Sequence, residues 1–227
     1  MDNYYGEKLN AQKLFQVYDT EIPRIRAYLQ AEIDFVRENL SKTQNVLELG
    51  AGYGRIVREL APYCKSIVGV DISEENIALG RSYLREYSNA SLLAMDVHKM
   101  AFTEKFDSIL CLQNGLSAMK ADLDLVHKIL EVLAPEGKAY FSSYSTKFWE
   151  HRLKWFEEQA NKGLLGEIDY DQTKNDVIVC KDGFKARIHS LKDFREIGEV
   201  MGYPYQVLEV DESSVFLVIH KEAKPLK

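Results

Sequence analysis

One carboxylate and three glycines stand at alternate positions in the segment 46–55, which reads Val-Leu-Glu-Leu-Gly-Ala-Gly-Tyr-Gly-Arg. A short apolar run carries Glu48, the glycines Gly50, Gly52 and Gly54 follow, and a helical apolar spacing begins after them. Glycine has no Cβ, so it adopts positive φ without strain and lets a ligand approach the backbone. The segment therefore predicts a strand, a tight turn and a helix, with a ligand lying across the turn.

A second carboxylate, Asp71, ends the next apolar run, 67–70. A doubly wound fold places at this point the carboxylate that holds the hydroxyl pair of a ribose, so the ligand is predicted to be a nucleoside. A pyrophosphate-binding turn would read G-x-G-x-x-G, but Arg55 or Val57 stands at the last position, depending on the starting glycine. Glu48 would also repel a pyrophosphate, whereas it suits a ligand with ammonium or sulfonium charge.

These residues resemble the first motif of the class I S-adenosylmethionine-dependent methyltransferases, apolar-apolar-Glu/Asp-apolar-Gly-x-Gly-x-Gly. The resemblance is specific over residues 45–144. It implies S-adenosylmethionine as the cofactor, because that molecule carries both an ammonium and a sulfonium. It also implies an α/β fold with a Rossmann-like, seven-stranded, mostly parallel sheet and helices on both faces.

The apolar spacing predicts how the chain divides. Residues 1–44 show helical spacing that Pro23 interrupts, and the resemblance implies that they form a lid over the donor pocket. Residues 45–227 form the methyltransferase domain, and an inserted cap at 145–190 follows the fifth strand. The predicted strands are 66–71, 90–95, 106–112, 138–144, 206–210 and 215–220 after the first one, with helices at 55–63, 73–87, 123–133 and 191–201.

The donor contacts that the resemblance implies lie on the lid and at the strand ends. Asp96 matches the acidic residue that accepts from the adenine amine, and the residue after it touches the ring. A guanidinium fork matches the donor carboxylate, and Arg26 is preferred over Arg24 because the second helix should be regular by that position. Tyr18 offers either a ring face to the sulfonium or a hydroxyl to the carboxylate. The complete predicted set is Tyr18, Arg26, Glu48, Gly50, Gly52, Asp71, Ile72, Asp96, Val97 and Gln113, with Tyr4 and Tyr5 as further lid candidates.

An alternative for the lid residues remains open, because Tyr18 and the arginines also fit an amphipathic helix with a solvated basic face. Asn114 follows Gln113 at the tip of the fourth strand, where the site of a parallel sheet lies, and is a candidate acceptor contact. The alternative is that both side chains only satisfy loop backbone.

The insertion is rich in aromatic residues, and Trp149 among them is a second candidate acceptor contact. Packing of the cap on the core explains the same residues equally well. Tyr144 and His151 are the titratable candidates for a catalytic role, although a lone helical histidine is more often structural.

Charge, cysteine content and apolar runs limit the classes of function that remain possible. The chain has 227 residues and a net charge of −6, which disfavours binding that relies on neutralising nucleic-acid phosphates. Cys64, Cys111 and Cys180 are widely spaced, so neither a disulfide framework nor a metal site is predicted. There is no long apolar run and no signal-peptide pattern at the first residues, which predicts a cytoplasmic protein that does not enter a membrane. A monomer or a homodimer is expected.

The function predicted from these observations is in-line methyl transfer from S-adenosylmethionine to a nitrogen or oxygen of a small molecule. Methylation of a protein or an RNA is an alternative within the enzyme class. A non-catalytic subunit that only binds the nucleoside is another, because the carboxylates bind the donor and not the acceptor. A nicotinamide dehydrogenase ranks last, since its turn pattern fails.

Overall fold

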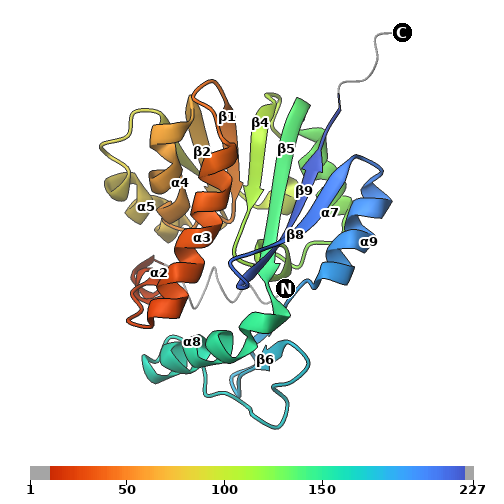
Figure 1. Ribbon diagram of the computed structural model, residues 1–227. Coiled ribbons are helices and arrows are strands. Elements are labelled where there is room, and N and C mark those ends of the chain that lie inside the picture. Colours follow the sequence, from red (N-terminus) through yellow and green to blue (C-terminus); the bar gives the residue numbers. More distant parts are fainter. Residues whose placement is uncertain (1–10, 223–227) are drawn as a thin grey trace.

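The computed structural model describes residues 11–222 and is built on a seven-stranded sheet with the strand order β3-β2-β1-β4-β5-β9-β8 (Figure 1). The strands from β3 to β5 pair in parallel, and β9 is antiparallel to both β5 and β8. The predicted α/β fold with a mostly parallel sheet is confirmed. The strands are β1 Asn45–Leu49, β2 Ser66–Asp71, β3 Ala90–Ala94, β4 Phe106–Cys111, β5 Leu133–Tyr144, β8 Tyr205–Val210 and β9 Ser214–His220.

Helices cover both faces of this sheet because the strand residues alternate between two apolar clusters. One cluster joins Leu47 and Leu49 to α7 and α9, and the other joins Val46 and Leu110 to α3, α4 and α5. Serine or aspartate side chains cap α5, α7 and α9, where they accept from backbone N–H groups that the first helical turn leaves unpaired. The helices are α3 Pro23–Asn39, α4 Arg55–Leu60, α5 Glu74–Tyr83, α6 Gly115–Ala118, α7 Leu123–Glu131 and α9 Leu191–Met201, with short 3-10 turns at Ala61–Tyr63 and Val97–Lys99.

The strand order reverses between β1 and β4, and such a reversal opens a crevice at the carboxyl ends of the strands. The glycine turn after β1 lies at this point, with φ values of 71° at Gly50, 56° at Gly52 and 87° at Gly54. Residues with a Cβ rarely adopt these angles. The backbone requirement that the sequence suggested is therefore present at all three positions.

Residues 145–190 lie beyond the carboxyl ends of the strands, below the sheet in Figure 1. They contain a 3-10 turn at Thr146–Phe148, the helix α8 (Trp149–Asn161) and the two-stranded hairpin of β6 (Val177–Val179) and β7 (Lys185–Arg187). Arg152 joins the two parts, because its buried guanidinium donates to the carbonyl oxygens of Asp176 and Ala186. We call residues 145–190 the cap.

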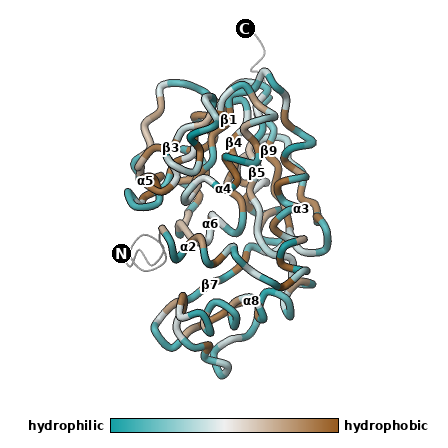
Figure 2. Tube along the Cα trace, turned by 90° about the vertical axis from the view of Figure 1, so that its left-hand side faces the viewer, coloured by the Kyte–Doolittle hydropathy of each residue, from teal (hydrophilic) through white to brown (hydrophobic). Residues whose placement is uncertain are grey.

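The helix α2 (Ala11–Tyr18) lies between the edge of the sheet and the cap (Figure 2). The backbone N–H of Ala11 donates to Asn76 on α5 at 2.6 Å, and the indole of Trp155 on α8 donates to the carbonyl of Val17 at 3.2 Å. By contrast α3 packs on the sheet face. Of the predicted lid, α2 thus contacts both core and cap, and the first turns of α3 also pack on the cap through Ile25, Tyr28 and Leu29. Tyr4 and Tyr5 lie outside the described residues.

The two largest differences from the predicted element ends lie in α5 and β5. The helix predicted over 73–87 stops at Tyr83, and tight turns occupy the remainder. Strand β5 already begins at Leu133, which pairs with Phe106 before a shift in register. Among the described residues, no helix combines the length and the apolar character needed to cross a membrane.

Candidate functional site

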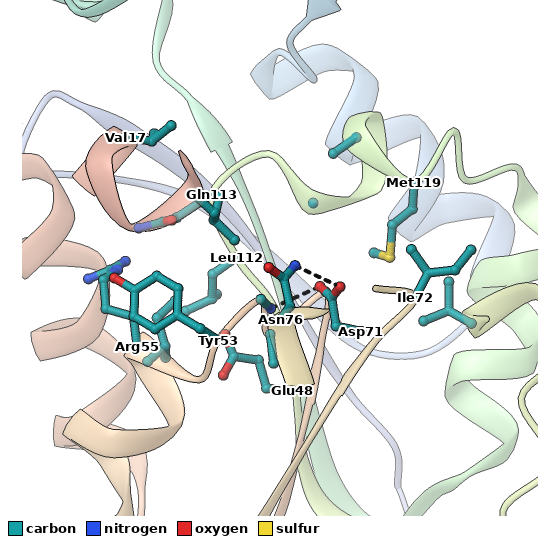
Figure 3. A pocket seen from close by; sticks show the side chains of 18 of the residues that line it. Val17, Glu48, Tyr53, Arg55, Asp71, Ile72, Asn76, Leu112, Gln113 and Met119 are labelled. Atoms are coloured by element: carbon teal, nitrogen blue, oxygen red, sulfur yellow. Dashed lines mark hydrogen bonds between the residues drawn. The ribbon is translucent and has the colours of Figure 1, made fainter. Parts of the chain in front are cut away.

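A cavity of about 350 Å³ opens at the carboxyl ends of β1, β2 and β4, between the sheet, α2 and the cap (Figure 3). The sheet side of the cavity is polar and the side formed by α2 and the cap is mostly aromatic. Of the residues predicted from the sequence, ten line this cavity: Tyr18, Glu48, Gly50, Gly52, Asp71, Ile72, Asp96, Val97, Gln113 and Tyr144.

Asp71 is held in place by three donors at the end of β2. Its Oδ2 accepts from the backbone N–H of Gly52 at 2.9 Å, and its Oδ1 accepts from the Ser73 N–H at 2.9 Å and from the Asn76 amide at 3.0 Å. Figure 3 shows the carboxylate between Asn76 and the glycine turn. Each carboxylate oxygen has about two acceptor sites, so the group retains capacity for ligand hydroxyls.

Glu48 lies deeper, with 3% of its surface exposed, and its Oε2 has no hydrogen-bond partner among the described residues. Burial raises the pKa of this carboxyl to about 8, while the guanidinium of Arg55 acts in the opposite direction. A buried carboxylate oxygen without a donor is costly. The position therefore favours a ligand that brings a positive charge to it.

Arg55 is a cavity residue that the sequence analysis missed. Its guanidinium carbon lies 4.5 Å from the centre of the Tyr18 ring, and its buried Nη2 has no hydrogen-bond partner among the described residues. Burial raises the pKa of Tyr18, so its hydroxyl stays protonated. The sequence position of Arg55 could have indicated it, because Arg55 directly follows the third glycine of the turn and begins α4.

Arg26, the predicted partner for a ligand carboxylate, does not reach the cavity. Its exposed side chain donates to the carbonyl of Glu21 at 2.8 Å. The reason is helical phase: Ile25, Tyr28 and Leu29 are buried on the inner face of α3, which turns position 26 towards solvent.

The tip of β4 separates the two residues that the sequence placed together. Gln113 and Asn114 both have positive φ, 54° and 63°, and only Gln113 lines the cavity. Asn114 is buried; its amide donates to the Arg187 carbonyl and accepts from the Ser143 hydroxyl. Asn114 therefore ties the strand tip to the cap, and the structure does not place it at the cavity.

The remaining candidates lie in the cap. Tyr144 reaches the cavity, with the guanidinium of Arg152 4.7 Å from its ring centre. His151 and Trp149 do not line it: His151 packs beside Phe148 at 5.4 Å, and Trp149 packs against the apolar cluster of the cap. The cap residues that do line the cavity were missed, although their helical spacing on α8 places them on one face: Trp155, Phe156 and Gln159, together with Phe184 from the hairpin.

The opposite end of the cavity lies beyond β2 and β3. Ile72, 48% exposed, stands beside Val97 and Met119, so a flat apolar group has contact surface there. Asp96 caps the short turn that follows it by accepting from the N–H of His98 at 3.0 Å. The acidic residue after the third strand thus lines the cavity, and its contact with adenine stays a prediction.

Comparison with known proteins gives a consistent result. Residues 46–137 match a family model described as a methyltransferase domain. Nodulation protein S of Sinorhizobium fredii (strain NBRC 101917 / NGR234) is 32% identical over 101 residues, which are 44% of this chain and 47% of that protein. The chain spans about half the length of the curated relatives it matches.

Two solved structures share the fold over nearly the whole chain. The DhpI–SAH complex is similar with a TM-score of 0.64 and 16% identity, over 92% of this chain and 92% of that one. N-methyltransferase NodS from Bradyrhizobium japonicum WM9, in complex with S-adenosyl-L-homocysteine (SAH), is similar with a TM-score of 0.56 and 18% identity, over 97% and 99% of the two chains. The match of the domain model over residues 46–137 and the strand order, with the glycine turn at its point of reversal, show that the chain has a Rossmann-like methyltransferase fold and is similar to S-adenosylmethionine-dependent methyltransferases.

Proposed function

We propose that the protein transfers the methyl group of S-adenosylmethionine to a small molecule. The observation that carries this proposal is the pair Glu48 and Arg55. Both side chains are ionisable, both have a buried atom without a partner among the described residues, and both face one cavity beside Asp71. A nucleoside that carries an amino-acid group, with its ammonium and its carboxylate, offers a partner to each of Glu48, Arg55 and Asp71.

The residues present fit the cofactor at each of its parts. Asp71 would hold the ribose hydroxyls, and Ile72, Asp96 and Val97 would hold the adenine. Glu48 would take the ammonium, and Arg55 would take the carboxylate through its planar fork. Gln113, whose Nε2 has no partner among the described residues, offers a further donor between these groups and the cap.

When bound, the cofactor supplies a methyl group that its sulfonium already activates. The chain then has to orient the acceptor in line with that group and to exclude water. Correct positioning supplies up to about 7–11 kcal/mol in well-oriented model reactions. The side chains of α2 that line the cavity and the aromatic side chains of the cap serve both purposes. Of the two predicted catalytic candidates, Tyr144 is the one that lines the cavity.

A small acceptor is favoured over a protein or an RNA because α2 and the cap cover the cavity. The N-methyltransferase NodS, which shares the fold, lends support to nitrogen as the acceptor atom. The alternative of a subunit that binds the nucleoside without turnover predicts no release of SAH with any acceptor.

Calorimetric titration tests the proposal. S-adenosylmethionine, SAH and NADH are titrated into the wild type, Asp71→Ala and the control Asp171→Ala, whose side chain is exposed in the cap. We expect micromolar binding of the two sulfur nucleosides to the wild type and the control, at least tenfold weaker binding to Asp71→Ala, and no binding of NADH. Binding of NADH without the sulfur nucleosides would overturn the proposal.

A further inference from the structure

Glu32 carries a fully buried carboxyl group that does not line the cavity. It follows Tyr28 and Leu29 by four and three positions, so it lies on the inner face of α3, where it is the one acidic residue among the buried ones. A carboxyl group is costly to bury unless hydrogen bonds satisfy it. The partners of Glu32 therefore indicate what the position is for.

The two oxygens of Glu32 join α3 to two parts of the sheet. Oε1 accepts from the hydroxyl of Ser214, the first residue of β9, at 2.7 Å. Oε2 accepts from the backbone N–H of Gln113, just beyond the end of β4, at 3.1 Å. The same N–H also donates to the hydroxyl oxygen of Ser142 on β5, at 2.8 Å. The backbone of Gln113 is thus held by two acceptors, and one of them comes from α3.

The backbone after β4 has an unusual conformation that needs this support. The φ angle is 54° at Gln113 and 63° at Asn114, and residues with a Cβ rarely adopt such values. A strained backbone of this kind costs free energy and persists only where neighbouring groups fix it, most often at ligand-binding sites. The bonds to Glu32 and Ser142 fix it here, which sets the direction of the Gln113 side chain.

The Gln113 side chain lines the cavity, and Figure 3 shows it extending toward the side on which Arg55 lies. Nε2 of Gln113 and Nη2 of Arg55 are both buried donors without a hydrogen-bond partner among the described residues. Burial raises the pKa of the Glu32 carboxyl to about 7, while its hydrogen bonds and then the charge of Arg55 oppose that rise, so Arg55 is an electrostatic neighbour of Glu32. Two donors on one side of the cavity suit the two oxygens of a carboxylate.

We propose that Glu32 is a positioning residue for the cofactor: it fixes the backbone of Gln113 so that the Gln113 amide donates, together with Arg55, to the carboxylate of S-adenosylmethionine. This role rests on the proposed function and adds to it a residue that does not touch the ligand. Because Glu32 acts through Gln113, the two residues contribute one joint effect, and it concerns the ligand carboxylate alone. A carboxyl group that only held α3 to the sheet would affect every ligand of the cavity alike.

Calorimetry with two matched ligands tests this role. SAH carries the carboxylate, and 5′-(3-aminopropyl)thioadenosine is the same molecule without it. Both are titrated into the wild type, Glu32→Ala, Gln113→Leu and the double variant. We expect SAH to bind each variant about tenfold more weakly than the wild type, the loss of one hydrogen bond to a charged group. The ligand without the carboxylate should bind all four proteins within about threefold, and the double variant should bind SAH as tightly as Gln113→Leu does.

Glu32→Gln keeps an acceptor for the Gln113 N–H and should restore SAH affinity, and Glu38→Ala, exposed on the same helix, should not change it. If circular dichroism shows that Glu32→Ala does not fold, Ser142→Ala replaces it, because it removes the other acceptor of the same N–H. Unchanged SAH affinity, equal weakening of both ligands, additive losses in the double variant, or Glu32→Gln as weak as Glu32→Ala would overturn the proposal. Failure of both ligands to bind the wild type would instead overturn the proposed function.

Discussion

Glu48 has opposite effects on folding and on ligand binding. Burial raises the pKa of its carboxyl from 4.5 to about 8 in the folded protein. The folded state therefore holds this proton more tightly than the unfolded state, so the stability that Glu48 contributes is present at low pH and is lost as the pH rises towards 8. The ammonium of the cofactor needs the ionised form, so ligand affinity rises over the same range.

Glu48→Gln is expected to separate these effects. The melting temperature of the wild type should fall more between pH 6 and pH 8 than that of the variant. SAH affinity at pH 8 should drop about 10- to 100-fold in the variant, the value of one charge-assisted hydrogen bond. Calorimetric melting and titration at both pH values measure the two effects, and a variant with wild-type SAH affinity at pH 8 would contradict the role of Glu48.

Arg55 and Arg26 provide a matched pair of substitutions. Arg55→Ala removes the buried guanidinium and should weaken SAH binding about tenfold or more. Arg26→Ala removes an exposed side chain that bonds to Glu21 and should leave SAH affinity within twofold. Titration of SAH into both variants measures the two affinities. Weaker binding to Arg26→Ala than to Arg55→Ala would show that Arg26 is the partner of the ligand carboxylate.

The difference between these arginines marks what could be predicted at this scale. Glu48, Asp71 and the glycines follow from the sequence because strand ends and positive φ angles fix where they point. The direction of the Arg26 side chain depends on which face of α3 packs on the protein, and the sequence alone does not show that face. Asn114 shows the same limit, since one step along the chain from Gln113 turns its amide from the cavity to the cap.

At the scale of elements, α3 is joined to the sheet through a buried carboxylate. Glu32 is fully buried; its Oε1 accepts from the Ser214 hydroxyl at 2.7 Å and its Oε2 accepts from the Gln113 N–H at 3.1 Å. Burial raises the pKa of Glu32 to about 7, although hydrogen bonds from Ser214 and Ser142 oppose the shift. Glu32 thus holds the strained tip of β4, where Gln113 and Asn114 have positive φ.

Substitution of Glu32 should affect stability first. Glu32→Ala leaves buried donors without an acceptor and is expected to cost roughly 2–4 kcal/mol of unfolding free energy. Glu32→Gln keeps an acceptor for the Gln113 N–H and removes the titrating group. It should match the wild type near pH 4.5 and exceed its stability at pH 8, because the wild type loses stability between the unfolded pKa of 4.5 and the folded pKa of about 7. Denaturant unfolding at both pH values is the measurement, and the exposed Glu38→Ala on the same helix is the control.

Local sequence signals predict most helices and strands, but they do not predict the residues at which these elements begin and end. The periodic apolar residues predict α5, α7 and α9, and the structure adds that Ser73, Asp122 and Ser190 cap them. The turn Asp182-Gly183 predicts the hairpin of the cap, where Gly183 has a φ of 93°. The start of β5 at Leu133 is different, because it depends on pairing with Phe106, a partner distant in the sequence.

In the whole molecule, the two sides of the cavity come from different layers of the fold. The sheet and its helices provide Glu48, Arg55 and Asp71 to the cavity. The cap and α2, which lie at the carboxyl ends of the strands (Figures 1 and 2), provide most of its aromatic side chains. The resemblance to a family covers the first side, whereas the second side has no sequence motif. Its lining could be assigned only once α8 and the hairpin were placed over the strand ends.

The hydrogen bond between Trp155 and α2 also gives the molecule an optical signal of its own. The chain has two tryptophans, and Trp155 is 3% exposed while its indole bonds to the backbone of Val17. Movement of α2 away from the cap would break that bond and admit water to the indole, which shifts its emission to longer wavelength. With Trp149 replaced by phenylalanine, the fluorescence of the single remaining indole reports the opening and closing of the cavity without any added label.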